Sequence, residues 1–294
     1  MYRKGQNLRC FINGAVVGAE TNLTITRGVD TEDGMNKDLA SDSTTGAPGG
    51  QNPIPVYKNM TFQVEAQGAG AKDLFARALA IMNATGGAVG FAPTNSTNNR
   101  TAESAVTAFQ AICNDLTLTA PNRQPVTCSA QFTVISETAT GSGGVAPAVD
   151  TTILRGEFLR LFLTDETPSY IGYATNVSLH ISLSMEDAST KDTTSPAGSL
   201  GYKDQQPTII NYDITSDCLY DGGLGTLVQG TTYEWELADA SGSHQQTKGT
   251  VIASGDALLT NLTENAPVNQ NITYNATFTG VGILNEMQPS QANL

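Results

Sequence analysis

An internal repetition is the feature that most constrains what this chain can fold into. The stretch ETNLTITRGVDTEDGMNKD (Glu20–Asp38) aligns without a gap with ATNVSLHISLSMEDASTKD (Ala174–Asp192). In both, a Glu-Asp pair is separated by three residues from a Lys-Asp pair. Apolar and polar residues alternate in both stretches, which is the pattern of a half-buried strand. Each stretch therefore predicts a strand that ends in the same acidic turn.

Two further blocks repeat in the same order. GQNLRCFING (Gly5–Gly14) aligns with GEFLRLFLTD (Gly156–Asp165), and APNRQPVTCSAQFT (Ala120–Thr133) aligns with APVNQNITYNATFT (Ala266–Thr279). The chain is rich in Thr and Ala, so biased composition is an alternative explanation, but Phe, Arg, Lys and Asp residues also align. Length differences fall only between the blocks, as they would in loops, and this favours duplication of one domain.

We accordingly predict two tandem domains. The first copy covers residues 1–137, a linker rich in Gly, Ser and Pro covers 138–151, and the second copy covers 152–294. The β-branched residues Thr and Val favour pleated, half-buried surfaces. The predicted fold class is therefore mainly β with a short helix, arranged as two small β-sandwich or barrel domains.

Within each copy the pattern predicts a short strand, a hairpin turn into a second strand, a long polar loop and a third strand. The third strands are Asn59–Gln67 and Ile209–Asp217, an alignment that matches Phe62 with Tyr212. Each copy then ends in two strands around its Ala-Pro turn.

The copies differ in the middle. Ala71–Asn83 has the apolar periodicity of an amphipathic helix, whereas Gly222–Gly230, with four glycines, supports at most a turn or a reduced helix. Thr231–Gly242 predicts a strand in the second copy. At the corresponding place in the first copy, Ala84–Ser104 predicts an inserted loop.

The net charge is -13 and the isoelectric point about 4.4. Binding to nucleic acid phosphates requires clusters of Lys and Arg, so such a surface should repel DNA and let it slide past. No stretch approaches the ~20 apolar residues that span a bilayer, and the N-terminal sequence lacks the apolar core of a signal peptide. We therefore expect no membrane partner and synthesis in a cytoplasm. The four cysteines lack CxxC spacing and should be buried free thiols.

The sequence carries no clear catalytic motif. His180 and His244 have no ligand at helical or zinc-type spacing and are interpreted as surface residues. A GxSxG elbow and a phosphate-binding loop are both missing from the sequence. The stretch Asp30–Gly34 (DTEDG) alternates carboxylates near a glycine, as a calcium loop does, but the second copy does not keep this pattern. We expect no enzyme activity, no cofactor and no metal.

The order of elements resembles a known family. Two strands, an acidic turn, a Lys-Asp pair, a long polar loop, a strand, a helix and two final strands are similar to the major tail protein, or tail-tube protein, of long-tailed bacteriophages (siphophages). The Lys-Asp motifs that carry the resemblance lie in Met35–Leu39 (MNKDL) and Ser189–Thr193 (STKDT). The resemblance implies tail-tube-like β-sandwich or barrel domains whose inner sheets join between neighbours around a lumen.

The same resemblance implies how the protein assembles. Family members with two fused domains form trimeric, pseudo-hexameric rings, and these rings stack into a tube through which DNA is ejected. The implied partners are further copies of this chain, other tail proteins such as the tape measure and terminator proteins, and DNA only in transit through the lumen. The implied location is the phage tail of the virion, after synthesis in the host bacterial cytoplasm.

Two groups of residues are candidates for function. The acidic turns and the loops that they open are interpreted as contacts between rings or subunits, through Glu32, Asp33, Lys37, Asp38, Glu186, Asp187, Lys191 and Asp192. Alternation along the third strands makes Glu65 and Asp213 candidate acids of the lumen wall.

Other classes of protein remain open at this point. A tandem β-sandwich binding module, such as an adhesin or receptor-binding protein, would carry exposed aromatic patches, but aromatic residues make up only 6% of the chain. A hydrolase with an irregular site would use His180 or His244. The tube of a related contractile injection system, or a secretion ring, would follow the same fold logic.

Overall fold

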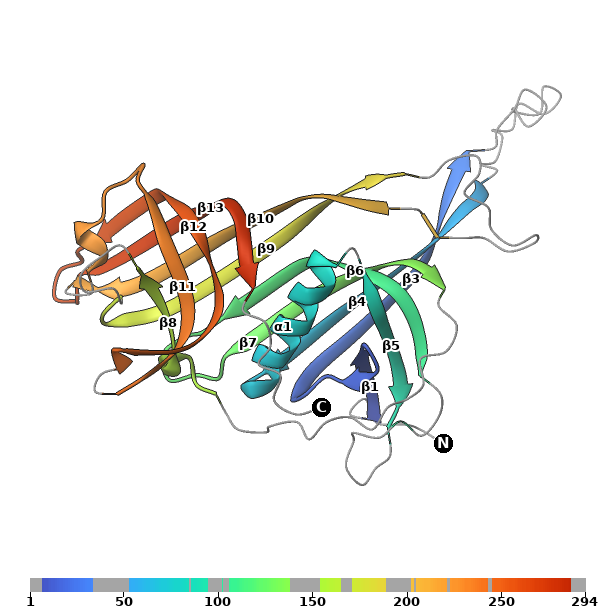
Figure 1. Ribbon diagram of the computed structural model, residues 1–294, viewed down its shortest axis with the longest axis horizontal. Coiled ribbons are helices and arrows are strands. Elements are labelled where there is room, and N and C mark those ends of the chain that lie inside the picture. Colours follow the sequence, from blue (N-terminus) through green and yellow to red (C-terminus); the bar gives the residue numbers. More distant parts are fainter. Residues whose placement is uncertain are drawn as a thin grey trace, which may run out of the picture.

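The computed structural model describes residues 7–33, 53–84, 86–94, 102, 106–137, 154–164, 171–188, 202–203, 205–220, 223–242 and 245–286. These residues form an antiparallel sheet of thirteen strands with one α-helix packed on it (Figure 1). The expectation of a mainly β fold with a short helix is therefore confirmed.

The strands are β1 (Leu8–Ile12), β2 (Ala15–Val16), β3 (Glu20–Asp33), β4 (Pro53–Gln67), β5 (Gly87–Pro93), β6 (Thr107–Thr119), β7 (Thr127–Glu137), β8 (Leu159–Leu163), β9 (Ala174–Asp187), β10 (Gln205–Leu219), β11 (Thr232–Ser241), β12 (Thr247–Asn265) and β13 (Thr273–Glu286). The helix α1 covers Ala69–Asn83, and the 3₁₀ turn η4 covers Leu224–Thr226.

The strands of the first and second parts of the chain are paired in the same order. In the first part the order is β1, β5, β6, β7, β4, β3, with β2 added beside β1. In the second part it is β8, β11, β12, β13, β10, β9. A side chain at the start of each series also makes the same contact, because Arg9 donates to the Val17 carbonyl and Arg160 to the Ile171 carbonyl.

Helix α1 forms because apolar residues recur on one of its faces. Leu74, Phe75 and Ala78 are fully buried on that face, and the helix packs against β4, β6 and β7. Gly68, with a φ of 61°, turns the chain into the helix. After β10, the described residues of the glycine-rich segment, 223–230, form η4 and no α-helix. Both helix expectations are confirmed, and no helix in the described residues is long and apolar enough to cross a bilayer.

The expected hairpin between the short first strand and the long second strand of each copy is wrong. Strand β1 turns through Asn13 and Gly14, with φ of 50° and 82°, into the short β2, and its other edge pairs with β5. An Asn-Gly turn with two positive φ angles suits such a tight hairpin. Strand β8 likewise pairs with β11 and not with β9. The first strand of each series therefore lies at the far end of its sheet from the second.

The expected inserted loop at Ala84–Ser104 is also wrong in part, because it contains β5. Two glycines give this strand the amino-acid composition of a loop. A Cβ on Gly87 would lie 2.7 Å from Ile81 of α1, and one on Gly90 would lie 2.4 Å from the Thr107 carbonyl oxygen of β6. These glycines permit close packing and do not mark a chain reversal.

The alignment of the third strands needs a shift of two residues. Phe62 pairs with Phe132 of β7, and Ile214 pairs with Phe278 of β13. Phe132 and Phe278 are matched in the repeated sequence, so Phe62 corresponds to Ile214 and not to Tyr212.

All four cysteines are free and buried, as expected: Cys10, Cys113, Cys128 and Cys218. Burial raises the pKa of the Cys10 and Cys128 thiols well above the ordinary value, which keeps them protonated and unreactive.

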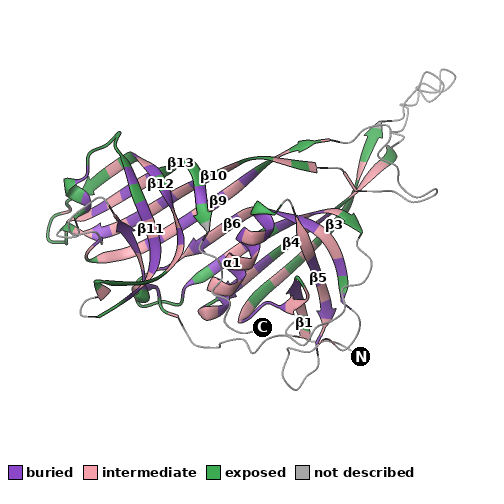
Figure 2. Cartoon of the chain, viewed as in Figure 1, coloured by how far each residue is buried: buried purple, intermediate pink, exposed green. Residues whose placement is uncertain are grey.

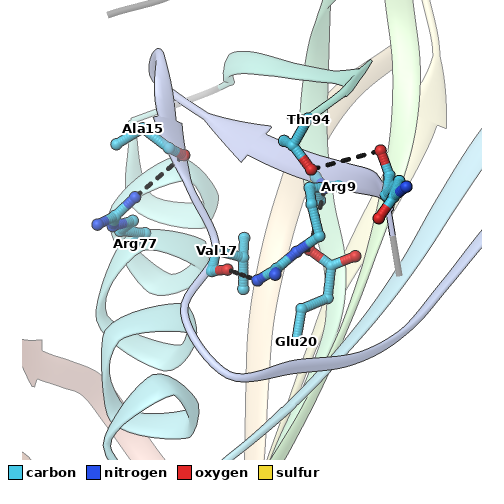
Figure 3. Close-up of polar contacts among 8 residues, drawn as sticks. Arg9, Ala15, Val17, Glu20, Arg77 and Thr94 are labelled. Carbon is cyan, nitrogen blue, oxygen red and sulfur yellow. Dashed lines mark hydrogen bonds and ion pairs between the residues drawn. The ribbon is translucent and has the colours of Figure 1, made fainter. Parts of the chain in front are cut away.

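A buried ion pair holds the connection between β1 and β3. Arg9 Nε lies 3.3 Å from Glu20 Oε2, which also accepts the Cys10 amide at 3.0 Å. Figure 3 shows the Arg9 guanidinium between Glu20 and the Val17 carbonyl. The Glu20 side chain is 4% exposed. Burial raises the pKa of Glu20 to about 7, although Arg9 opposes this shift.

Glu20 should make the folded protein less stable as the pH rises. Its pKa is about 7 in the folded state against an ordinary value of 4.5, so the folded state binds more protons between these values. The free energy of unfolding then falls over this range, by on the order of 3 kcal/mol in total. We expect the wild-type Tm to fall between about pH 5 and about pH 8, and the Glu20→Gln variant to show a flatter profile.

Glu186→Gln is the matched control, because it removes a carboxyl that is exposed. This variant should keep the wild-type slope. An undiminished slope in Glu20→Gln would contradict the assignment.

Candidate assembly surface

Strand β6 joins the two series of strands. Its first part, Thr107–Ala111, pairs with β5, and its last part, Asp115–Thr119, pairs with Ser178–Ser182 of β9. A β-bulge between Cys113 and Asp115 separates the two parts. We call the β6–β9 pairing the seam.

The core-facing side of the seam is apolar. Leu116 lies opposite Ile181, and Leu118 lies opposite Leu179. All four side chains are at most 1% exposed. Burial of each contributes roughly 1.5–3 kcal/mol, so the seam is part of the stable core.

The opposite side of the seam is polar. His180 Nε2 lies 2.9 Å from Asp115 Oδ2, and the hydroxyls of Thr119 and Ser178 are 3.1 Å apart. His180 was expected on the polar side of a strand without a role. Its partner was not foreseen, because the sequence does not show that β6 and β9 are neighbours.

Close contacts beside the seam also hold the two series of strands against each other. Gly156 lies so near the backbone that a Cβ would be 2.2 Å from the Pro121 carbonyl oxygen. On the helix side, Lys72 of α1 forms an ion pair of 2.6 Å with Asp239 of β11.

A second contact between the series involves the residues just before β10. Lys203 Nζ lies 3.0 Å from Asp30 Oδ2 of β3, and this hydrogen bond raises the pKa of Lys203. The Tyr202 hydroxyl lies 3.9 Å from the Met60 sulfur of β4. The Lys58 ammonium lies 5.9 Å from the centre of the Tyr202 ring. Apart from Asp30, which belongs to the calcium-like stretch, none of these residues was singled out from the sequence, which gave no signal for contacts between the series.

The face of the sheet opposite the core is polar. Along β4, β6, β7, β9 and β10, buried residues alternate with exposed or half-buried ones (Figure 2). The outward positions of these strands, which we call the polar face, are Thr61, Gln63, Glu65, Asp115, Thr117, Thr119, Ser129, Gln131, Thr133, Ser178, His180, Ser182, Asn211, Asp213, Thr215 and Asp217. These positions include four acids and neither Lys nor Arg. Such a surface has little to hold a phosphate group.

The two candidate lumen acids lie on one row of the polar face. From strand to strand the register runs Glu65, Ser129, Thr117, His180, Asp213. Neighbouring strands are 4.7–4.9 Å apart, so the two acids are separated by about 19 Å along the sheet. That this row faces a lumen stays a prediction.

The acidic turn ends the long strand in both series. Strand β3 ends at Asp33 and β9 at Asp187, which are matched positions of the repeat. Glu32 and Glu186 are exposed at these strand ends. The remaining candidates for contacts between rings, Lys37, Asp38, Lys191 and Asp192, lie outside the described residues.

In the described part of the chain, no group of three His, Cys, Asp or Glu side chains is placed to hold a metal ion. Asp30, from the calcium-like stretch, forms the ion pair with Lys203. His244 lies outside the described residues.

Comparison with known proteins gives a weak likeness to a solved structure. No family model matches the chain, and no curated protein matches it. Among the solved structures that it resembles is one described as "Tail of empty GTA particle computed with helical refinement, C6 symmetry". The two share 14% sequence identity with a TM-score of 0.32, over 46% of this chain and 98% of the other. A TM-score of this size is too low to assign a fold.

Gly156→Ala should loosen the joint between the two series. The added Cβ would meet a backbone oxygen, which cannot move aside as a flexible side chain does. We expect a loss of roughly 2 kcal/mol or more in the free energy of unfolding, measured by urea denaturation.

Gly28→Ala is the control, because a Cβ there meets nothing within 4 Å. It should change the free energy of unfolding by less than about 0.5 kcal/mol. Equal effects of the two substitutions would show that Gly156 is not a point of close packing.

Proposed function

We propose that this protein is a structural subunit of a bacteriophage tail tube and not an enzyme. Residues 1–137 and 152–294 would act as two equivalent domains, so that three chains form a pseudo-hexameric ring. Rings stack into the tail of the virion, where the tube contacts the tape measure and terminator proteins and conducts DNA. The observation that supports this proposal is the seam, in which two series of strands with the same pairing order join edge to edge.

Two other strand edges in the described residues correspond to those of the seam and have no partner strand. Among the described strands, none pairs with the second edge of β3, whereas the second edge of its counterpart β9 is covered by β6. Within the same residues, none pairs with Asn261–Asn265 of β12 on the edge away from β13, although β6 is covered by β9 at the matching place. A contact between two different edges repeats from copy to copy and closes a ring when the rotation allows it.

The polar face supplies a suitable wall for a DNA conduit. DNA must pass along a tail tube without being held, and phosphates are held chiefly by Lys and Arg. The polar face carries acids, hydroxyls, amides and one histidine, and the whole chain has a net charge of -13. In the proposed ring this face lines the lumen, with Glu65 and Asp213 on one circumferential row.

The direct test is the state of the purified protein. We expect negative-stain electron microscopy to show rings and stacked tubes, and sedimentation velocity to show assembly that increases with concentration. A protein that stays monomeric at high concentration, also with the other tail proteins added, would contradict the proposal. A binding module such as an adhesin would stay unassembled and attach to cells or glycans instead.

A lumen position for Glu65 and Asp213 predicts that positive charge there traps DNA. Tubes of Glu65→Lys/Asp213→Lys should retain at least about ten times more short DNA than wild-type tubes, and the retention should fall steeply with added salt. Cosedimentation of labelled DNA with assembled tubes measures this.

Glu65→Gln/Asp213→Asn is the matched variant, because it removes the negative charges without adding positive ones. Its retention should lie between those of wild type and the lysine variant. Equal retention by all three tubes would argue against a lumen position.

The long loops are proposed to lock each ring to its neighbours through Lys37 and Lys191. Charge reversal at both positions should shorten or abolish tubes while the chain stays folded by circular dichroism. Arg123→Glu/Lys248→Glu gives the same change in charge at other sites and should leave tube length unchanged. Tubes of normal length in the loop variant would rule out this role.

A further inference from the structure

We propose that β3 of one chain pairs with the end of β12 of a second chain, in antiparallel orientation, with Thr26 opposite Thr263. This inference rests on the proposed tail-tube function. It adds the strands and the register through which one chain joins the next. The seam inside the chain is the template from which the register is taken.

The end of β12 corresponds to the part of β6 that forms the seam. Asn261–Asn265 of β12 and Asp115–Thr119 of β6 both follow a β-bulge, and both lead into an Ala-Pro turn. On its other edge, the β12 segment pairs with β13 and the β6 segment pairs with β7, and these are the last strands of the two series in chain order. The two segments therefore present equivalent edges.

Strand β3 corresponds to β9 in the same way. Thr24–Gly28 aligns without a gap with Ser178–Ser182, and the two strands end at matching residues, Asp33 and Asp187. Each strand pairs on one edge with the next strand along the chain, β4 or β10. The other edge of β9 is the one that β6 covers in the seam.

The register of the seam then transfers residue by residue. Within the chain, Thr117 lies opposite His180. The matching residues at the open edges are Thr263 and Thr26, both of which are exposed in the single chain. The transferred register therefore brings these two threonines opposite each other on the polar face.

The side chains at the two open edges complement each other. On the core-facing side, the register places Arg27 opposite Leu262 and Ile25 opposite Glu264. Arg27 and Glu264 then lie on a diagonal, which long side chains can bridge. Both are exposed in the single chain. Arg27 and Glu264, which have opposite charges, thus occupy positions that are apolar in the seam.

One chain cannot make this contact with itself. In the sheet, β3 and β12 are separated by β4, β7, β6, β9, β10 and β13. At 4.7–4.9 Å per strand this is about 34 Å along the sheet. Figure 1 shows the two strands on opposite sides of the molecule. The partner of each open edge is therefore a second copy of the chain.

Disulfide trapping between two different variants tests the register. Chains with Thr26→Cys are mixed with chains with Thr263→Cys, assembled into tubes and oxidised. Directly opposed strand residues have Cα atoms about 4.5–5.5 Å apart, within the range that a disulfide spans. The native cysteines are buried and should not compete. We expect a covalent dimer on non-reducing gels that needs both variants.

The register control replaces Thr263→Cys by Asn261→Cys, which lies on the same face but one pair away. It should give at least about ten times less dimer, because diagonal residues are too far apart for a disulfide. Tubes that assemble but cross-link as well or better in the control would overturn the register and leave the proposed function standing. Wild-type protein that never assembles would overturn both.

A charge exchange gives a second, independent readout. Arg27→Glu should raise the concentration needed for assembly at least about tenfold, because it places two acids on the diagonal. Arg27→Glu/Glu264→Arg should restore assembly to within about threefold of wild type, with circular dichroism confirming that each variant is folded. A double variant that assembles no better than the single one would overturn the pairing.

Discussion

Along one edge of β6, two successive parts of the backbone have to be paired by two different strands. Strand β5 pairs with Thr107–Ala111 and β9 with Asp115–Thr119. An unpaired buried amide or carbonyl costs about 1–3 kcal/mol, so neither partner can be removed cheaply. The bulge at Cys113 lets the strand change partners without losing its pairing to β7 on the other edge. Through this one strand the two series become a continuous sheet.

The sequence was a good guide wherever a local pattern repeated. Alternation revealed the long strands, periodicity revealed α1, and the aligned blocks matched β7 with β13 and β1 with β8. It failed where packing between distant segments decided the structure. Gly87 and Gly90 gave β5 the composition of a loop, although they are needed for contact with α1 and β6. The pairing of β6 with β9 leaves no signature in either strand, so the His180–Asp115 contact could not be foreseen. The ion pair of Lys203 with Asp30 likewise joins segments whose proximity the sequence does not show.

The two series reach similar cores with different residues. In β5, Gly87 leaves room for Ile81 of α1. At the matching place β11 has Tyr233, whose ring packs edge-on against Phe278 at 6.3 Å. The Tyr233 hydroxyl accepts the Val228 amide at 2.9 Å, beside η4. An aromatic side chain thus fills the space that a helix fills in the other series, which explains why the second series keeps its pairing order without a full helix.

A strand edge that pairs with another chain must pair tightly in the assembly and must avoid indiscriminate pairing before it. Because the two series are joined in one chain, different strand edges can meet these two requirements. The apolar pairs of the seam, such as Leu118 with Leu179, are buried as soon as the chain folds. They are therefore not exposed to solvent while the chain waits for a partner. The open edges carry Arg27 and Glu264 at matching places, and charges on an exposed edge discourage indiscriminate pairing. In the proposed ring, half of the edge contacts would thus be made by folding, at a rate that does not depend on concentration. Only the other half would wait for encounters between chains, so the proposed tube could grow from subunits that are already folded.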